Sequence, residues 1–243
     1  MLVAVDLGNS AIKVGAFDGS RLVAVERVDT RRSLAEDAIP PEHLVRADEV
    51  VVVASSPSRV AEFLDWCGRP ARVLGDDARR SLRTTYARVE DLGLDRIAAV
   101  VGARALTGAV SVAVADAGTA ITVDALDREG RLVAVAIAPG LRVAADGLHA
   151  RAPHLAFPDL RPGAAAVPAR GTADSMRAGH VLGVAGLVDR LLDEAARAAG
   201  GVDVCVLTGG DADALSPHLR TVHVSEPHAV LHGIRVLHTL VPA

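Results

Sequence analysis

The sequence predicts an α/β protein built from two similar halves, each with the element order βββαβαβα, around a central cleft. One observation is an internal repeat: residues 3–18 (VAVDLGNSAIKVGAFD) and residues 112–127 (VAVADAGTAITVDALD) are identical at eight of sixteen positions. The other is that patterns typical of buried strands alternate with helical patterns after each copy. We expect a boundary near Thr107–Gly108 and two domains, residues 1–108 and residues 109–243.

Each copy of the repeat is expected to form a three-stranded meander. Its β-branched residues are interrupted by Gly, Asn and Asp, which is typical of strands joined by tight turns. Both copies continue with the same pentapeptide, Arg-Leu-Val-Ala-Val, at residues 21–25 and 131–135. A slip of one residue also brings Asp6-x-Gly8 onto Asp116-x-Gly118. Because Ala and Val are abundant, accidental similarity is the competing interpretation.

Other elements follow from periodicity and capping signals. Buried strands are predicted at residues 50–54 and 204–207. Ser56 and Pro57 have the character of an N-cap and a first helical residue, so a helix should lead from there to Cys67. Further helices are predicted at residues 92–106, 140–149 and 172–199. The last of these carries an apolar stripe of Val181, Leu182, Val184, Leu187, Leu191 and Leu192.

The composition is that of a soluble globular protein. Of 243 residues, 50% are hydrophobic and 23% are charged, with a formal net charge of −4. These values exclude collagen-like, disordered and disulfide-scaffold classes, and they give no reason to expect nucleic acid or a membrane as partner. Cys67 and Cys205 lie in apolar stretches, so we expect buried thiols in a reducing cytoplasm. The C-terminal histidines match no standard zinc spacing: His223, His228, His232 and His238.

Asparagine, lysine and tyrosine are each represented by a single residue. The chain has one asparagine (Asn9), one lysine (Lys13) and one tyrosine (Tyr86), while arginine supplies the other 25 basic residues. A GC-rich genome explains this scarcity. Because Asn9 and Lys13 lie within five residues of each other, they also mark a candidate site.

The first turn, Asp6-Leu7-Gly8-Asn9-Ser10, has the residues to bind phosphate. Glycine lets the backbone approach an anion closely, and successive N–H groups in such a turn hold phosphate oxygens. Asn9 and Ser10 add donors, and Lys13 adds a cation. Asp6 would hold a hydrated magnesium ion beside the phosphates. The alternative is an ordinary hairpin with an Asx-turn.

The second copy carries a similar turn, Asp116-Ala117-Gly118-Thr119-Ala120. Two such turns, facing each other, clamp the phosphates of a nucleotide in the fold shared by actin and many sugar kinases, which favours phosphotransfer. A third glycine-rich turn, Leu207-Thr208-Gly209-Gly210-Asp211, would suit a flat adenosine contact. It is equally compatible with a strand-to-helix linker.

Asp95 lies at the start of a predicted helix, within Gly93-Leu94-Asp95-Arg96. As a functional group it would take a proton from a substrate hydroxyl, with Arg96 holding a substrate carboxylate. The alternative is a first-turn carboxylate that interacts with the helix dipole and with Arg96.

At these residues the chain resembles the type III pantothenate kinases over nearly its whole length. Five motifs of that family occur here in order: D-x-G-N-T, a Tyr followed by G-x-D-R, D-x-G-T-A, I-x-P-G and T-G-G-D-A. They stand at Asp6–Ser10, at Tyr86 with Gly93–Arg96, at Asp116–Ala120, at Ile137–Gly140 and at Thr208–Ala212. Each motif alone is weak, whereas five in order are specific.

The resemblance implies an actin-like, sugar-kinase-like (ribonuclease H-like) fold. It also implies transfer of the ATP γ-phosphate to the terminal hydroxyl of pantothenate, the first step of coenzyme A biosynthesis. Asp95 would be the general base, and Asp116 would bind a monovalent cation, potassium or ammonium. Pantothenate would contact Tyr86, Gly93, Leu94, Asp95, Arg96 and Thr172. ATP would contact Asp6, Leu7, Gly8, Asn9, Ser10, Ala11, Ile12, Lys13 and Thr119. The family is dimeric, with the pantothenate pocket near the interface, so a homodimer is expected.

The chain departs from the family pattern at several positions. Ser10 replaces a threonine and keeps the hydroxyl, and Val89 replaces a proline. Further departures are Ala134 and Val135 for two glycines, Gly171 for an asparagine, and Ala152-Pro153-His154-Leu155-Ala156 for T-A-x-L-P. Since Gly171 and Ala152 lie close to the expected substrate pocket, another hydroxylated carboxylate is an alternative substrate. The alternative function is a nucleotide-binding regulatory or accessory role without turnover.

Overall fold

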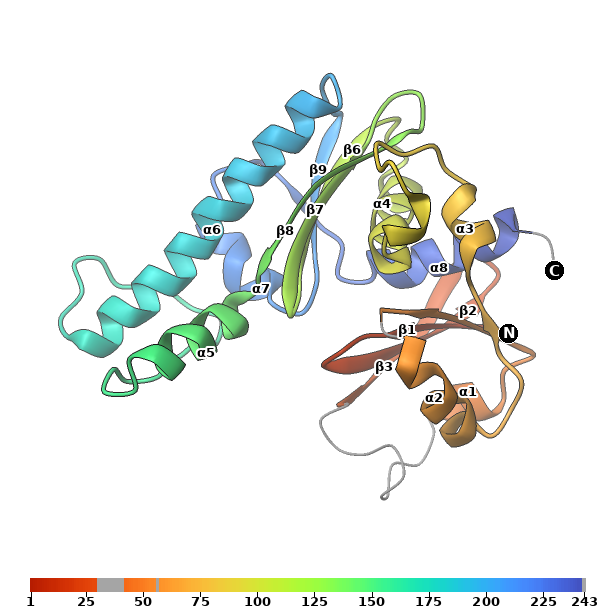
Figure 1. Ribbon diagram of the computed structural model, residues 1–243, viewed down its shortest axis with the longest axis horizontal. Helices are drawn as coiled ribbons and strands as arrows, with labels where there is room; N and C mark the ends of the chain where they lie inside the picture. The colour runs from red at the N-terminus through yellow and green to blue at the C-terminus, as the bar shows by residue number, and fades with distance from the viewer. Residues whose placement is uncertain (30–41, 56, 242–243) are drawn as a thin grey trace. The chain divides into compact units, whose positions relative to one another are not determined.

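Two five-stranded mixed sheets organise the chain, one in each of two units (Figure 1). The computed structural model describes residues 1–29, 42–55 and 57–241. The first unit comprises Met1–Gly108 and His228–Ala243, and the second comprises Ala109–Pro227. The predicted N-cap Ser56 lies outside the described residues.

In the first unit the strand order is β3-β2-β1-β4-β5. An antiparallel meander is formed by β1 (Leu2–Leu7), β2 (Ala11–Asp18) and β3 (Arg21–Asp29). The sheet continues in parallel through β4 (Glu49–Ala54) and β5 (Arg72–Val73). Because β1 and β4 are buried along nearly their whole length, their sequences are almost continuously apolar.

The second unit repeats this arrangement, with the order β8-β7-β6-β9-β10. Its meander is formed by β6 (Val112–Ala117), β7 (Ala120–Leu126) and β8 (Leu132–Pro139). The parallel strands are β9 (Val204–Thr208) and β10 (Val224–Ser225). The predicted duplication, both meanders and the buried strand at residues 50–54 are therefore confirmed. The strand at residues 204–207 is also present, but Val204 and Cys205 are only partly buried, so the expectation of a buried thiol is wrong at Cys205.

The gapless alignment of the two repeats is wrong by one residue before the first turn. Asp6 pairs with Lys13 across the first hairpin, and Asp116 pairs with Thr122 across the second. Six residues lie between the first pair and five between the second. The first loop is therefore one residue longer, which explains the slip that superposes Asp6 on Asp116.

Helices connect the strands largely where periodicity predicts them. In the first unit α2 (Val60–Cys67) follows the 3-10 turn η1 (Pro57–Arg59), and α4 (Leu94–Thr107) begins two residues later than predicted. In the second unit α5 (Leu141–Arg151) and α6 (Thr172–Ala198) lie at the predicted places. The short elements had no sequence signal: α1 (Glu42–Val45), α3 (Asp76–Arg80), η2 (Val89–Asp91), α7 (Ala212–Leu215) and η3 (Ser216–His218).

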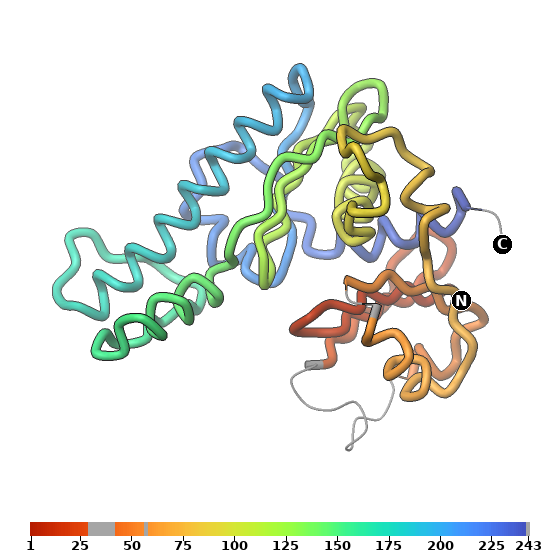
Figure 2. The backbone as a smooth tube through the Cα atoms, in the orientation of Figure 1, coloured from red at the N-terminus to blue at the C-terminus, as the bar shows by residue number. Residues whose placement is uncertain are grey.

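The C-terminal helix α8 (Ala229–Leu240) packs against α4 in the first unit, whereas the sequence assigns this segment to the second domain (Figure 2). Glycines bring the two helices into contact. A Cβ on Gly102 would lie 1.8 Å from the carbonyl oxygen of Ala229, and one on Gly233 would lie 1.8 Å from the carbonyl oxygen of Ala98. Only residues without a Cβ allow this approach, and it is the physical reason that the segment joins the first unit.

Helix α6 covers one face of the second sheet (Figure 1). It contributes to the apolar core of that unit with Val181, Val184, Ala185, Val188, Leu192 and Ala195. The predicted stripe is wrong at Leu182, which is 37% exposed, because the buried face runs through small alanines instead. Within the described residues, no helix is long and apolar enough to cross a membrane.

Candidate active site

The first candidate phosphate loop joins β1 to β2. The Gly8 N–H donates to the Ala11 carbonyl oxygen at 3.2 Å, and a Cβ on Gly8 would lie 2.9 Å from that oxygen, so a larger residue would open the turn. Asp6 is 8% exposed, and Lys13 Nζ lies 3.8 Å from its Oδ2. A buried carboxylate with a cation beside it, at a main-chain turn, suits the predicted binding of phosphate and hydrated magnesium.

The turn after β4 supports this loop. The Ser55 N–H donates to the Leu7 carbonyl oxygen at 3.2 Å, and Arg59 Nη1 donates to the Gly8 carbonyl oxygen at 3.2 Å. Ser55 also reaches α4, because its hydroxyl donates to Asp95 Oδ2 at 3.1 Å. Sequence reasoning missed Ser55 and Arg59, since neither belongs to a motif and their partners lie 40 or more positions away.

Asp95 occupies the first turn of α4, after the N-cap Gly93. The Arg96 N–H donates to Asp95 Oδ1 at 3.0 Å, so each carboxylate oxygen accepts one hydrogen bond. A Cβ on Gly93 would lie 2.4 Å from Oδ1, and any other residue there would therefore displace the carboxylate. The side chain is half-buried, held from two sides and accessible to a small molecule.

Arg96, the next residue of the helix, is a buried cation. It is 5% exposed, its Nη1 donates to the Tyr86 hydroxyl at 2.6 Å, and its guanidinium carbon lies 5.4 Å from the centre of the Tyr86 ring. A guanidinium fixed in this way presents planar donors that match a carboxylate ligand. The structure thus brings together Tyr86 and the Gly93–Arg96 segment, as the resemblance implies.

The replacement of the family proline by Val89 leaves the backbone of this segment suitable for either residue. Val89 begins the turn η2, and Arg88 before it is extended, with φ −121° and ψ 109°. A residue that precedes proline adopts this conformation, and the first position of a helical turn accepts proline. The departure therefore does not alter the path of the chain between Tyr86 and Gly93.

The second candidate phosphate loop follows β6 in the second unit. The Gly118 N–H donates to the Ala120 carbonyl oxygen at 3.1 Å, and Thr119 is exposed between them. The start of α5 packs directly on this loop, since the Gly140 N–H donates to the Thr119 carbonyl oxygen at 3.0 Å. A Cβ on Gly140 would lie 2.0 Å from the Gly118 carbonyl oxygen. Contact with the loop therefore explains the glycine after Pro139.

The third glycine-rich turn packs against Asp116. Gly209 has φ +100°, where glycine is favoured, and a Cβ on it would lie 2.5 Å from Asp116 Oδ1 and 2.4 Å from the Ala117 carbonyl oxygen. The Asp211 N–H donates to the same carbonyl oxygen at 2.8 Å. This turn therefore shapes the second phosphate loop, while its contact with adenosine stays a prediction.

Thr172 begins α6 in the second unit and is exposed. Gly171 before it is extended, with φ −174° and ψ 180°, so the family asparagine would fit the same backbone. The Arg170 N–H donates to Asp174 Oδ2 at 3.1 Å and secures the start of the helix. The position of Thr172 relative to Asp95 depends on how the two units meet and stays a prediction. That the two candidate phosphate loops face each other across a cleft stays a prediction for the same reason.

The other departures from the family pattern lie on β8 and at the end of α5. Ala134 pairs with Asp124 on β7 beside a register irregularity, and Val135 packs against the core of the second unit. Ala152 is the C-cap of α5, and its N–H donates to the Leu148 carbonyl oxygen at 2.8 Å. These residues therefore form part of the second sheet and of the end of α5.

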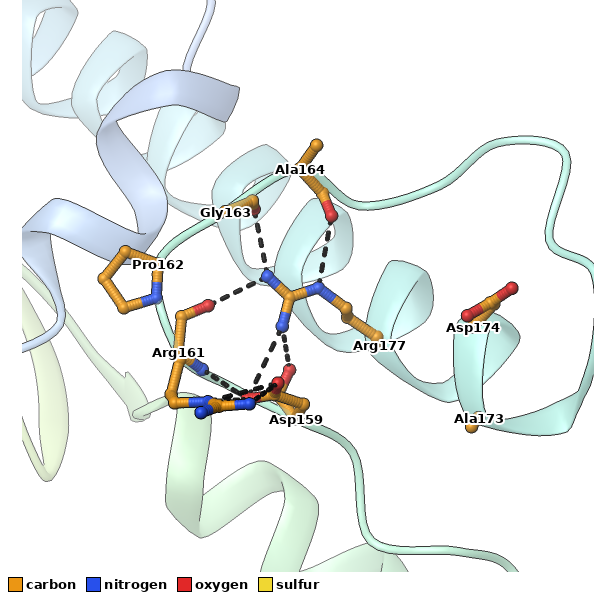
Figure 3. Close-up of a pocket in the computed structure, with 8 residues that line it drawn as sticks. All are labelled: Asp159, Arg161, Pro162, Gly163, Ala164, Ala173, Asp174 and Arg177. Atoms are coloured by element: carbon orange, nitrogen blue, oxygen red, sulfur yellow. Dashed lines mark hydrogen bonds and ion pairs between the residues drawn. The ribbon is translucent and has the colours of Figure 1, made fainter.

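A cavity of about 450 Å³ lies beside the start of α6 (Figure 3). The Arg177 guanidinium lies inside the preceding loop and donates to the carbonyl oxygens of Asp159, Arg161 (2.8 Å), Gly163 (3.0 Å) and Ala164 (3.3 Å). Hydrogen bonds from Arg161 lower the pKa of Asp159. Sequence reasoning missed these hydrogen bonds from Arg177, which hold the loop that precedes Thr172.

The C-terminal histidines make separate contacts. His238 Nε2 lies 3.1 Å from Glu49 Oε2. His232 packs edge-on against Phe17, and burial lowers the pKa of its imidazole. Among the residues that the structure describes, no three His, Cys, Asp or Glu side chains form a group that could hold a metal ion.

Comparisons with known proteins agree with the motifs. A family model described as type III pantothenate kinase matches residues 2–194. The type III pantothenate kinase of Geobacter sulfurreducens is 32% identical over 254 residues, which cover 98% of each chain. That of Rubrobacter xylanophilus is 33% identical over 260 residues, which cover 99% of this chain and 98% of the relative.

Solved structures share the fold at low sequence identity. A Campylobacter jejuni protein described as a Baf family transcriptional activator matches with a TM-score of 0.62 at 17% identity, covering 98% of this chain and 97% of that one. An ROK hexokinase from Thermus thermophilus matches with a TM-score of 0.51 at 16% identity, covering 97% of each. The predicted sugar-kinase-like fold is therefore confirmed. With its matching family model and its full-length relatives, the chain belongs to the type III pantothenate kinase family.

Proposed function

We propose that this chain transfers the γ-phosphate of ATP to the terminal hydroxyl of pantothenate, the first step of coenzyme A biosynthesis, with Asp95 as general base. Membership of a kinase family makes the chain an ATP-using transferase, so a regulatory role without turnover is not favoured. One observation carries the residue-level proposal: the half-buried Asp95 carboxylate accepts a hydrogen bond from the Arg96 main-chain N–H, and the buried Arg96 guanidinium donates to the Tyr86 hydroxyl.

Asp95 accepts the proton of the attacking hydroxyl. The hydroxyl oxygen forms a bond to the γ-phosphorus while the bond from that phosphorus to the bridging oxygen of ADP breaks. Hydrogen bonds from the Arg96 N–H and the Ser55 hydroxyl hold the carboxylate in one orientation. A positioned general base of this kind contributes about 10²–10⁴-fold to the rate.

The pantothenate carboxylate binds to Arg96. The guanidinium is buried and held by the Tyr86 hydroxyl, and its planar geometry matches that of a carboxylate ligand. Gly93 and Leu94 form the adjoining main chain, and Thr172 completes the set from the second unit. Its exposure at the start of α6 supports this role.

The ATP phosphates lie against Asp6–Lys13 and Thr119. Asp6 suits a magnesium ion held through water, because its carboxylate is nearly buried at the loop, while Lys13 beside it suits a phosphate. Asp116 suits a monovalent cation, since its carboxylate lies beside the main chain of the second loop, where oxygen ligands are available. When bound, these ions neutralise charge on the transferring phosphates. The free thiols of Cys67 and Cys205 support a cytoplasmic location.

A homodimer with the pantothenate pocket near its interface is part of this proposal. Apolar side chains are exposed on β8, α5 and α6 of the second unit: Ile137, Val143, Leu148 and Leu182. Exposed apolar side chains mark contacts with other chains where they form a continuous patch, and these four are the candidates for such a patch. Light scattering should give the mass of two chains, and the mass of a single chain would contradict this part of the proposal.

The test of the function is ATP consumption by the purified protein with pantothenate, with and without potassium. We expect turnover that needs pantothenate and increases with potassium. Pantoate, a smaller hydroxylated carboxylate, serves as the comparison substrate. No turnover of pantothenate under any cation, from protein shown to be folded, would overturn the proposal, and faster turnover of pantoate would replace the substrate.

A further inference from the structure

Ser55 lies between the first phosphate loop and the proposed base. It follows β4 directly, and its N–H extends the β1–β4 ladder by donating to the Leu7 carbonyl oxygen at 3.2 Å. Leu7 immediately precedes Gly8, so this main-chain bond fixes Ser55 relative to the phosphate loop. The Ser55 side chain then reaches in another direction, to Asp95 Oδ2 at 3.1 Å.

The two hydrogen bonds to Asp95 differ in what they fix. The bond from the Arg96 N–H to Oδ1 comes from the next residue of the same helix and moves with α4. The bond from Ser55 to Oδ2 comes from the end of a buried strand, 40 positions earlier in the chain. It is therefore the bond that can fix the carboxylate relative to the sheet and to the loop that the sheet carries.

We propose that Ser55 is a positioning residue for phosphoryl transfer, acting through Asp95. The Ser55 hydroxyl fixes the position of the Asp95 carboxylate relative to the first phosphate loop. The substrate hydroxyl that Asp95 deprotonates is thereby placed in line with the γ-phosphate. In-line transfer needs the reacting atoms about 3–3.5 Å apart, and a small misplacement lowers the rate steeply. This inference rests on the proposed function of Asp95 as base.

The arrangement allows a clean substitution. Ser55→Ala removes the hydroxyl but keeps the N–H bond to Leu7, so the loop keeps its main-chain support. We therefore expect kcat to fall about tenfold, while the KM values for ATP and pantothenate stay within about twofold of wild type. Ser55→Thr keeps a hydroxyl on the same backbone and should restore most of the rate.

A matched control separates positioning from general damage. The Ser81 hydroxyl donates to the Ala78 carbonyl oxygen at 2.7 Å at the end of α3, in the same unit. Ser81→Ala therefore loses a comparable hydrogen bond away from the proposed base and should keep the wild-type kcat. Circular dichroism and thermal unfolding of both variants verify that they fold.

The decisive measurement is a double-mutant cycle with Asp95→Asn. If Ser55 acts through the carboxylate, Ser55→Ala should cause no further loss of kcat in the Asp95→Asn background, because groups that act as a unit are not additive. An undiminished tenfold loss in that background would overturn the positioning role, and so would a wild-type kcat for Ser55→Ala alone. No turnover of pantothenate by the wild-type enzyme would instead overturn the proposed function, and this inference with it.

Discussion

The two units share a strand order but differ in what supports their phosphate loops. After β4, in the first unit, side chains add to the main-chain bond from Ser55, because Arg59 donates to the loop carbonyl oxygen of Gly8 and the Ser55 hydroxyl donates to Asp95. After β9, in the second unit, it comes from the main chain, because Gly209 lies directly against the loop and the Asp211 N–H donates to it.

This difference shows where the two halves diverged. The carboxylates Asp6 and Asp116 keep equivalent places in their hairpins, while the loop of the first unit is one residue longer than that of the second. The segment after β4 therefore supports its loop in a way that is sensitive to the loss of the Arg59 side chain, whereas the segment after β9 is sensitive to a side chain gained at Gly209. Gly209→Ala and Arg59→Ala test this contrast directly, while Asp95→Asn and Gly102→Ala test the base and a helix contact of the first unit. The four are given in order of expected effect.

Asp95→Asn should have the largest effect, because it removes the proposed base, which has no counterpart in the second unit. The amide keeps the size of the side chain but cannot take the proton, so kcat should fall about 100-fold or more. ATP consumption at saturating pantothenate measures it. Asp91→Asn, which alters an exposed carboxylate paired with Arg88, is the control and should keep the wild-type rate. A rate for Asp95→Asn close to that of this control would remove Asp95 from its role.

Gly102→Ala should destabilise the first unit. The added methyl group would lie 1.8 Å from the Ala229 carbonyl oxygen, so α4 and α8 must separate, at a cost of about 3 kcal/mol in the free energy of unfolding. Chemical denaturation measures this. In Gly183→Ala, on α6, the new Cβ meets nothing within 4 Å, and helix propensity should raise stability by up to about 1 kcal/mol. Equal stabilities of the two variants would contradict the close helix contact.

Gly209→Ala should disturb the second phosphate loop by pushing on Asp116. We expect kcat/KM for ATP to fall about tenfold, with a weaker response to potassium. Gly201→Ala is a matched control, because Gly201 has φ +102° against +100° for Gly209 but no atom within 4 Å of its Cβ position. The control shares the backbone strain without the contact, so an equal loss in both variants would assign the effect to strain alone.

Arg59→Ala should have the smallest effect. It removes the hydrogen bond from Nη1 to the Gly8 carbonyl oxygen, which is worth about 0.5–1.5 kcal/mol, so KM for ATP should rise about threefold with little change in kcat. Arg46→Ala, which removes an exposed guanidinium paired with Glu42, should leave KM unchanged. An unchanged KM in Arg59→Ala would mean that the loop keeps its shape without this side chain.

Much of the fold could be predicted because its signals are local. The internal repeat predicts six strands, three in each unit. The helix α4 ends at Thr107, next to the predicted boundary, where the N-terminal segment of the first unit also ends. The one-residue offset between the two repeats before the first turn was harder to predict. Val and Ala fill neighbouring strand positions equally well, and the sequence identity of the two repeats is highest in the gapless alignment, which is wrong there. The assignment of α8 could not be predicted, since Gly233 signals a close approach without naming its partner.

The motifs of the candidate site could be predicted from the sequence, but the residues that hold them in place could not. Gly93–Arg96 and Tyr86 are close in the chain, so their meeting follows from local structure. Ser55 and Arg177 are ordinary residues in their own segments, and their roles come from contacts that only the folded chain creates. Such contacts carry no spacing rule that a single sequence reveals.

The placement of α8 has a consequence for how the chain is made. The first unit is discontinuous, since it needs Met1–Gly108 and also the segment that begins at His228. During synthesis the glycine face of α4 stays uncovered until that last segment has left the ribosome, whereas every residue of the second unit is already available. Domains fold as units as they emerge, so the unit that carries Asp95 can be completed only after α8 has been made, when every residue of the second unit is already present.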